Sequence, residues 1–267
     1  MGGPAALSGV ARASSARRAW KAGLGWQGKE MRIAIVSDVH GNLAALEAVI
    51  ADLARTAPDL VVHGGDLALN GPRPAECVDR IRELGWPGVV GNTDQALWWM
   101  PTELPENAAR VFARLVERTA ELLGEERIGW LRRLPLEWRR EDEVALVHAV
   151  PGDTWRGVMP EVPDEELERH YGSLGAALAV YGHIHRPYVR RLGRFTVANS
   201  GSVGLPYDGD PRPSYLLVTD GEPEVRRVAY DVERHLRDLE SSGYPSASWL
   251  AMQARTAAGG FPRLDQG

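Results

Sequence analysis

The chain has 267 residues, of which 44% are hydrophobic and 25% are charged, and its formal net charge is -5. This acidic balance argues against non-specific nucleic-acid binding, which depends on clustered lysines and arginines, and no apolar run approaches the roughly 20 residues needed to span a membrane. Cys77 is the only cysteine, which excludes an intrachain disulfide and a thiolate metal cluster and leads us to expect a cytoplasmic protein.

Residues 1–30 differ in character from the rest of the chain. They are rich in Ala, Gly, Ser and Arg, show no clean hydrophobic period and lack the continuous apolar stretch of a secretory signal. Met31 directly precedes the first convincing strand, which suggests that Met31 is the natural start. We expect residues 1–30 to be a disordered or non-native extension and residues 31–260 to form one domain. A basic targeting peptide is the alternative for the extension.

From Met31 the sequence alternates between short apolar runs and helical spacing. We expect strands at residues 33–36, 60–62 and 89–90, each followed by a glycine-containing turn. Apolar residues between 43 and 53 recur at helical spacing, and a second helix is expected over residues 73–84. Strands that alternate with helices in this way predict a largely parallel sheet with right-handed crossovers.

The second half of the chain has a different pattern. Residues 95–133 are rich in Ala, Leu, Arg and Glu and are expected to be helical. Short runs separated by turn residues then predict strands at 136–140, 144–148, 177–181, 187–191, 195–199, 214–218 and 224–228. Two helices are expected at the end, over residues 231–242 and 247–257.

Polar side chains follow the expected strands at the points where the strands end. Asp38 and His40 follow the first strand, Asp66 the second and Asn92 the third, with glycines beside them that let the backbone turn sharply. In open α/β sheets the carboxyl ends of the strands are where ligands bind. His148 ends a later strand. His183 and His185 are two residues apart, so in an extended segment they face one site together.

The order of these residues resembles the calcineurin-like metallophosphoesterases, in particular the small bacterial and archaeal phosphodiesterase branch. The family pattern of D-x-H, G-D, G-N-H-[DE], a lone H and G-H-x-H stands here as Asp38-Val39-His40, Gly65-Asp66, Gly91-Asn92-Thr93-Asp94, His148 and Gly182-His183-Ile184-His185. The resemblance covers residues 31 to about 245. It implies an α/β fold, a four-layer αββα sandwich of two mixed β-sheets flanked by helices.

The resemblance also implies a ligand assignment for two divalent metal ions. Asp38, His40 and His185 would hold the first ion, Asn92, His148 and His183 the second, and Asp66 would bridge them. Imidazole and carboxylate ligands suit Mn, Fe, Zn, Ni or Co. Two divalent ions bring +4 and the carboxylates of Asp38 and Asp66 only -2, which leaves positive charge for a hydroxide and a phosphate.

The implied activity is hydrolysis of a phosphodiester or an activated phosphomonoester by attack of a hydroxide that bridges the metals. The substrate would be a phosphate-ester small molecule or a nucleotide. By resemblance the catalytic set is Asp66, Asn92, Thr93 and Asp94. Thr93 departs from the family, which has a histidine there, and threonine cannot be a general acid near neutral pH.

Two other functions stay open. One is a phosphomonoesterase that acts on a metabolite or a phosphoprotein. The other is a metal-binding pseudoenzyme or regulatory protein that lost turnover together with the histidine. The sequence alone does not decide the oligomeric state.

Several residues have simpler interpretations. Asp38 and Asp94 could be helix N-caps, and Asn92 could be a turn residue. His148, taken alone, could be a structural residue of a strand.

His63 is a candidate neighbour of the ligands. Substrate contacts are possible at Trp98, Trp99 and Arg156, against the alternatives of a core and a surface position. We expect His170 and His235 to be solvated on surface helices. We expect Cys77 to be a packing residue of its helix.

Overall fold

The computed structural model describes residues 31–102 and 106–260, together with the side chains of these residues except 106–108. The expected extension, residues 1–30, lies outside the described residues, so the proposed boundary at Met31 stays a prediction. None of the helices within the described part of the chain has the length and apolar character that a membrane span requires.

Nine strands in the described ranges form two sheets. They are β1 (Arg32–Val36), β2 (Leu60–His63), β3 (Glu137–Arg140), β4 (Val144–Val147), β5 (Leu178–Tyr181), β6 (Tyr188–Leu192), β7 (Phe195–Asn199), β8 (Ser214–Thr219) and β9 (Glu222–Arg227). The first sheet has the order β2-β1-β8-β9 and the second the order β3-β4-β5-β7-β6.

Both sheets are mixed, so the expectation of a largely parallel sheet is wrong. In the first sheet β1 is parallel to β2 but antiparallel to β8. In the second, β5 is parallel to both β4 and β7, while β3 and β6 add to the edges in antiparallel fashion. The reason is local: β6–β7 and β8–β9 are joined by short turns, and a short turn can join only antiparallel strands.

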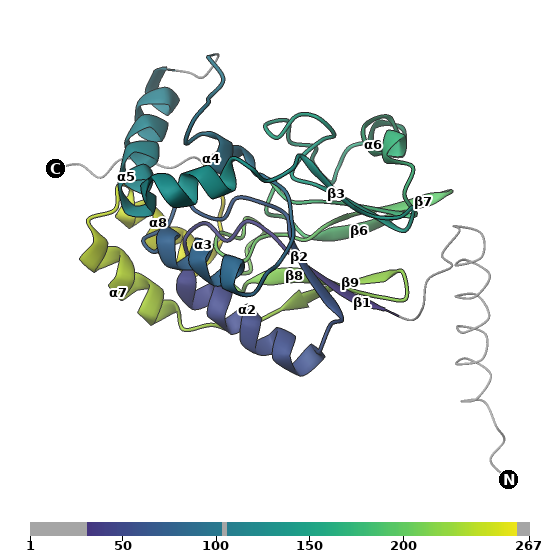
Figure 1. Cartoon of the computed structure of the whole chain (residues 1–267), viewed down its shortest axis with the longest axis horizontal. Coiled ribbons are helices and arrows are strands. Elements are labelled where there is room, and N and C mark those ends of the chain that lie inside the picture. The colour runs from purple at the N-terminus through teal and green to yellow at the C-terminus, as the bar shows by residue number, and fades with distance from the viewer. Residues whose placement is uncertain (1–30, 103–105, 261–267) are drawn as a thin grey trace, which may run out of the picture.

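Helices cover the outer faces of the two sheets, which gives the four-layer αββα sandwich that the resemblance implied (Figure 1). They are α2 (Leu43–Thr56), α3 (Pro74–Glu83), α4 (Asn92–Gln95), α5 (Glu106–Leu131), α6 (Asp164–Tyr171), α7 (Val232–Ser242) and α8 (Ala247–Thr256), with a 3₁₀ turn at Gly172–Leu174. Figure 1 shows α2 and α3 beside the first sheet and α6 beside the second.

The alternation of side chains along β1 explains the layering. Ile33 and Ile35 pack between the sheets, against Val144 and Leu178 of the second sheet. The intervening Ala34 and Val36 face the other way and belong to the apolar cluster that α2 completes. Because successive strand residues point to opposite faces, one apolar strand serves two layers of the core.

Two expected elements differ in the structure. Residues 89–90 do not form a strand; Gly88 makes an isolated parallel bridge with His63, and the amide of Val90 donates to the carbonyl of Pro135 at 2.9 Å. The expected helix over residues 95–133 is interrupted, because α4 ends at Gln95 and α5 begins at Glu106. Gly124 then kinks α5 with a φ of 70°.

His235 corrects another expectation, while Cys77 meets one. His235 is 4% exposed on α7, next to the buried Leu236, so it is buried rather than solvated. The polar neighbours of His235 in sequence had suggested a solvated face. His170 is partly exposed, and Cys77 packs in the core beside α2 as expected.

Candidate metal centre

The candidate ligands lie at one edge of the sandwich, where parallel strands of both sheets end. The loops after β1 and β2 carry Asp38, His40 and Asp66 from the first sheet. The segments after β4 and β5 carry His148, His183 and His185 from the second sheet. Since the carboxyl ends of β1, β2, β4 and β5 meet at this edge, residues up to 147 positions apart become neighbours.

Four of these side chains form one compact buried group. One potential ligand atom from each of Asp38, His40, Asp66 and His185 lies within 4.8 Å of the other three. The Nε2 atoms of His40 and His185 are 3.1 Å apart, and Nε2 of His185 is 3.1 Å from Oδ1 of Asp38. Nitrogen and carboxylate oxygen atoms that converge in this way are able to hold a divalent metal ion.

Backbone carbonyls set the orientation of three imidazoles. Nδ1 of His40 lies 2.7 Å from the carbonyl oxygen of Leu69, and Nδ1 of His148 lies 2.7 Å from that of Gly64. Nδ1 of His185 is 2.6 Å from the carbonyl of Leu205. A carbonyl only accepts, so each Nδ1 carries the proton and each Nε2 offers a lone pair to the centre.

A second group gathers around the side chain of Asn92. Its Oδ1 is 2.9 Å from Nε2 of His148 and 2.9 Å from Nδ1 of His183. His183 therefore points Nδ1 toward the centre, whereas the three histidines held by carbonyls point Nε2 toward it. Gly157 lies against this ring, where a Cβ would come within 3.3 Å of Cδ2 of His183.

Asp66 lies between the two groups. Its Oδ2 is 3.7 Å from Nε2 of His40 and 3.4 Å from Nε2 of His148. The other oxygen, Oδ1, accepts a hydrogen bond from the backbone amide of Thr93 at 2.9 Å. One oxygen is therefore anchored to the start of α4, while the other points between the two sets of nitrogen atoms.

The backbone at the centre adopts a conformation that residues other than glycine rarely take. Positive φ angles of 57°, 48°, 55°, 66° and 56° occur at Asp38, His40, Asp66, His183 and His185. Residues of this kind in the left-handed region cluster at functional sites, where the surrounding structure holds the strain. The expectation that His183 and His185 converge through an extended segment is wrong. They converge because both residues are left-handed.

Two glycines allow the backbone to approach the carboxylates. A Cβ at Gly91 would lie 2.0 Å from Oδ1 of Asp66, and one at Gly182 would lie 2.4 Å from Oδ2 of Asp38. Neither position has room for any side chain. The amide of His183, the next residue, lies 3.2 Å from both oxygens of Asp38 and donates to that carboxylate.

Electrostatics favour ionised carboxylates and, at His40 and His183, neutral imidazoles. Burial opposes the charge of Asp38 and Asp66, but the neighbouring histidines keep the pKa of both carboxyls below its ordinary value. Burial lowers the pKa of His40 and takes that of His183 down to about 4. His148 differs: burial lowers its pKa, yet the charge of Asp66 outweighs this and raises it to about 9. Neutral imidazole is the form that binds metal.

Asp94 and Thr93 have distinct surroundings. Oδ1 of Asp94 accepts hydrogen bonds from the amides of Leu67 and Ala68 at 2.9 and 3.3 Å, and Oδ2 accepts from Gly91 at 3.4 Å. This buried carboxylate ties the Asp66 loop to the Asn92 loop. Thr93 is 5% exposed, and its hydroxyl is buried without a hydrogen-bond partner among the described residues.

The other candidates lie outside the two ligand groups. His63 is fully buried against the ring of Trp130, and its ring nitrogens have no partner in the described ranges. Trp98 packs against the core, whereas Trp99 is 52% exposed. Arg156 is exposed and precedes Gly157, the residue that contacts His183.

The sequence reasoning missed two features beside the centre. Tyr207 packs on His185 with ring centroids 4.5 Å apart, and its amide donates to the carbonyl of His185 at 3.1 Å. On the other flank, Oε1 of Gln95 accepts hydrogen bonds from Thr154 and Trp155 at 2.8 and 2.9 Å. No local motif marks these residues; a tyrosine after Gly-Leu-Pro in a loop is an ordinary pattern.

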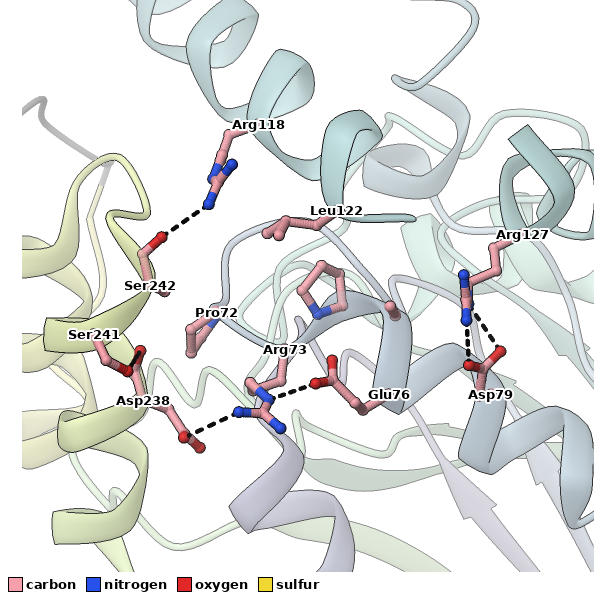
Figure 2. Close-up of a pocket in the computed structure, with 12 residues that line it drawn as sticks. Pro72, Arg73, Glu76, Asp79, Arg118, Leu122, Arg127, Asp238, Ser241 and Ser242 are labelled. Carbon is pink, nitrogen blue, oxygen red and sulfur yellow. Dashed lines mark hydrogen bonds and ion pairs between the residues drawn. The ribbon is translucent and has the colours of Figure 1, made fainter. Parts of the chain in front are cut away.

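A hollow of about 550 Å³ lies away from the ligands, between α3, α5 and α7. Figure 2 shows Arg73 reaching Glu76 and Asp238, and Arg127 paired with Asp79. Arg118 donates to the carbonyl of Ser242 at 2.9 Å. We call this cavity the Arg118 hollow. Its arginines are matched by acids or a carbonyl, so it offers no obvious unbalanced charge to an anion.

The chain is similar to several known proteins. The calcineurin-like phosphoesterase superfamily domain matches residues 31–222. The protein MJ0912 of Methanocaldococcus jannaschii is 30% identical over 240 residues, which cover 82% of this chain and 95% of that protein. Phosphodiesterase YfcE of Escherichia coli K12 is 25% identical over 205 residues, covering 71% of this chain and 89% of the enzyme.

A solved structure gives the same result for the fold. The crystal structure of a metallophosphoesterase from Sphaerobacter thermophilus aligns with a TM-score of 0.72 and 28% sequence identity. The alignment covers 86% of this chain and 100% of that chain.

Proposed function

Because this chain belongs to the calcineurin-like phosphoesterase superfamily and is a metal-dependent hydrolase of ester bonds, we propose that it uses two divalent metal ions to hydrolyse a phosphodiester or an activated phosphomonoester. The observation that carries the proposal is the position of Asp66. Its Oδ2 lies within 3.7 Å of His40 on one side and within 3.4 Å of His148 on the other. A carboxylate placed between two groups of ligand atoms suits a bridge between two ions.

The donor chemistry supports this assignment. Asp38, His40 and His185 would hold one ion, and Asn92, His148 and His183 the other. Carbonyls hold Nδ1 of His40, His148 and His185, so the Nε2 atoms already point to the centre, and His148 would release the Nε2 proton that Asp66 stabilises when a metal binds. Nitrogen and oxygen donors of this kind suit Mn, Fe, Zn, Ni or Co. When bound, two such ions supply a water of lowered pKa and neutralise the charge of a phosphate.

Two carboxylates of this chain have positioning tasks in that reaction, and Thr93 marks a missing group. Asp66, held by the amide of Thr93, keeps the two ligand groups at a fixed separation. Asp94 positions the Asp66 and Asn92 loops through its hydrogen bonds to Leu67, Ala68 and Gly91. The small Thr93 side chain stands where relatives with the family pattern have histidine, so the chain lacks that proton donor for the leaving group.

This arrangement favours esters whose leaving group departs as an anion. A positioned general acid contributes typically 10²–10⁴-fold to such a reaction, and most of it for poor leaving groups. Substrates with phenol-like leaving groups therefore suit the site better than alkyl esters. Small phosphate esters and nucleotides are the proposed substrate class.

A metal-by-substrate screen tests the proposal. Purified protein is stripped of metal, reloaded with Mn²⁺, Zn²⁺, Ni²⁺ or Co²⁺, and assayed on bis(p-nitrophenyl) phosphate and on p-nitrophenyl phosphate. We expect metal-dependent turnover that is faster on the diester and is lost in Asp66→Ala. Turnover on the monoester alone would make the chain a phosphomonoesterase. Stoichiometric metal binding without turnover on either ester would make it a metal-binding pseudoenzyme and reject the proposal.

A further inference from the structure

A second hollow borders the metal centre. It has a volume of about 570 Å³ and is lined by Met159, Ile184, Tyr207 and the segment 257–260, with Arg186 and Asp208 also on its wall. We call it the Tyr207 hollow. Its size lies within the range of about 300–1,000 Å³ that is usual for small-molecule sites.

The walls of this hollow are continuous with the candidate ligands. Ile184 lies between His183 and His185 in the chain. Tyr207 packs its ring on His185, with centroids 4.5 Å apart. Met159 follows two residues after Gly157, which contacts the ring of His183. The lining therefore touches one candidate ligand, His185, through Tyr207 and is continuous in the chain with His183 and His185 through Ile184.

The far wall comes from the chain after α8. The amide of Gly209 donates to the carbonyl of Ala257 at 3.1 Å, which fastens this segment to the loop that carries Tyr207. A Cβ at Gly259 would lie 3.5 Å from Cβ of Tyr207, so the segment packs directly on the tyrosine. Ala258 is exposed on the same wall.

The charges of the lining decide what the hollow can accept. Arg186 donates to Glu161 at 2.6 Å, and Asp208 is paired with Arg227. The remaining lining is a thioether, an aliphatic side chain, a phenol ring and small residues. With its charged groups paired and an aromatic wall, the hollow suits an uncharged ring better than a second phosphate.

We propose that the Tyr207 hollow is a substrate subsite that receives the uncharged, ring-bearing group of a phosphodiester, such as a nucleoside, with its ring stacked on Tyr207 or packed against Met159. This inference rests on the proposed function, because it places that ring beside the phosphate at the metal centre. It narrows the substrate class from any phosphodiester to one whose retained group is aromatic or a nucleoside.

The test compares two diesters that share one leaving group. Thymidine 5′-(p-nitrophenyl phosphate) and methyl p-nitrophenyl phosphate both release p-nitrophenol, so they differ only in the group that the subsite would hold. Ala258→Trp fills the hollow from one wall, and Met159→Trp fills it from the opposite wall. Ser241→Trp fills the Arg118 hollow of Figure 2 and is the matched control. Far-ultraviolet circular dichroism and metal content confirm that each variant is folded and loaded.

We expect both filling variants to lower kcat/KM for the thymidine ester by about tenfold or more, the scale of one lost stacked ring. Hydrolysis of the methyl ester should stay within about twofold of wild type. The Ser241→Trp protein should match wild type on both. Equal effects on the two esters, or none, would overturn the subsite and leave the proposed function intact.

A binding measurement covers the case in which neither ester turns over, an outcome that counts against the proposed function. Calorimetric titration of metal-loaded wild type should then show tighter binding of thymidine 5′-monophosphate than of methyl phosphate. The Ala258→Trp protein should lose that difference. Equal affinity of wild type for the two phosphates would overturn the subsite.

Discussion

The backbone amide of Thr93 donates a hydrogen bond to Oδ1 of Asp66 at 2.9 Å, which joins the loop after β2 to the start of α4. This bond leaves Oδ2 of Asp66 as the oxygen that faces both His40 and His148. The position of the central carboxylate therefore depends on the backbone at residue 93 and is independent of which side chain stands there.

The first prediction concerns metal content. Asp66→Ala should reduce binding at both sites, because its carboxylate is the one that lies beside both groups of ligand atoms. His40→Ala should empty mainly one site, since its Nε2 lies with Asp38 and His185. Elemental analysis after exhaustive dialysis measures the ions per chain. His170→Ala is the control and should retain both ions. Two ions per chain in the Asp66→Ala protein would refute the bridge.

The second prediction concerns the leaving group. Wild type should show a steep fall in rate as the pKa of the leaving group rises, because Thr93 supplies no general acid. Thr93→His should flatten that dependence and raise the turnover of alkyl esters more than that of aryl esters, by up to the 10²–10⁴-fold that a general acid contributes. The measurement is kcat/KM across a series of aryl and alkyl phosphodiesters.

Thr93→Val is the matched control for this series. Valine has the shape of threonine without the hydroxyl, and that hydroxyl has no hydrogen-bond partner in the described ranges. We expect this variant to keep the steep dependence of wild type. A flat dependence in wild type itself would mean that another group already protonates the leaving oxygen.

The third prediction assigns a positioning role to Asp94. Asp94→Ala leaves the buried amides of Leu67, Ala68 and Gly91 without their acceptor and should cost roughly 2–4 kcal/mol of unfolding free energy. It should also lower kcat, since the loops of Asp66 and Asn92 lose their link. Asp94→Asn keeps one oxygen acceptor and should lose less in both measurements. Urea denaturation and steady-state kinetics on the same samples check this, and full activity in Asp94→Ala would contradict it.

The fourth prediction is a pH dependence of stability. Burial lowers the pKa of His235 to about 4, so the folded state stays unprotonated while the unfolded state binds a proton below about pH 6.5. Above pH 6.5 this histidine therefore leaves the free energy of unfolding unchanged. As the pH falls from 6.5 to 4, it lowers the free energy of unfolding by about 1.4 kcal/mol per pH unit.

His235→Leu should reduce that loss. Between pH 7.5 and pH 5 the unfolding free energy of the variant should fall by about 2 kcal/mol less than that of wild type. Arg237→Leu, on an exposed position of the same helix, should keep the pH dependence of wild type. Urea denaturation at the two pH values measures the difference. Parallel losses in wild type and His235→Leu would show that His235 titrates normally in the folded protein.

Much of the sandwich can be read from local patterns. The continuous apolar run at residues 33–36 predicts a buried strand, and β1 packs on both of its faces. Pairing direction is harder, because the antiparallel β8 inserts beside β1 from far along the chain. Residues 89–90 have strand composition, but the amide of Val90 bonds to Pro135 instead of to a neighbouring strand.

The candidate ligands followed from their order along the chain, but their geometry did not. The carbonyls of Leu69, Gly64 and Leu205 orient three imidazoles, and a backbone carbonyl has no signature in a sequence. Positive φ at His183 and His185 is likewise invisible, because histidine rarely adopts it without support from the fold. Tyr207 becomes a neighbour of His185 only through tertiary folding.

Titration of the metal-free protein with Mn²⁺ tests the central claim most directly. The hydrolysis rate of bis(p-nitrophenyl) phosphate is followed against the number of Mn²⁺ equivalents per chain. If two ions bridged by Asp66 carry the reaction, activity rises until two equivalents are bound and then stays constant. Full activity at one equivalent, or no hydrolysis with two equivalents bound, would contradict the account.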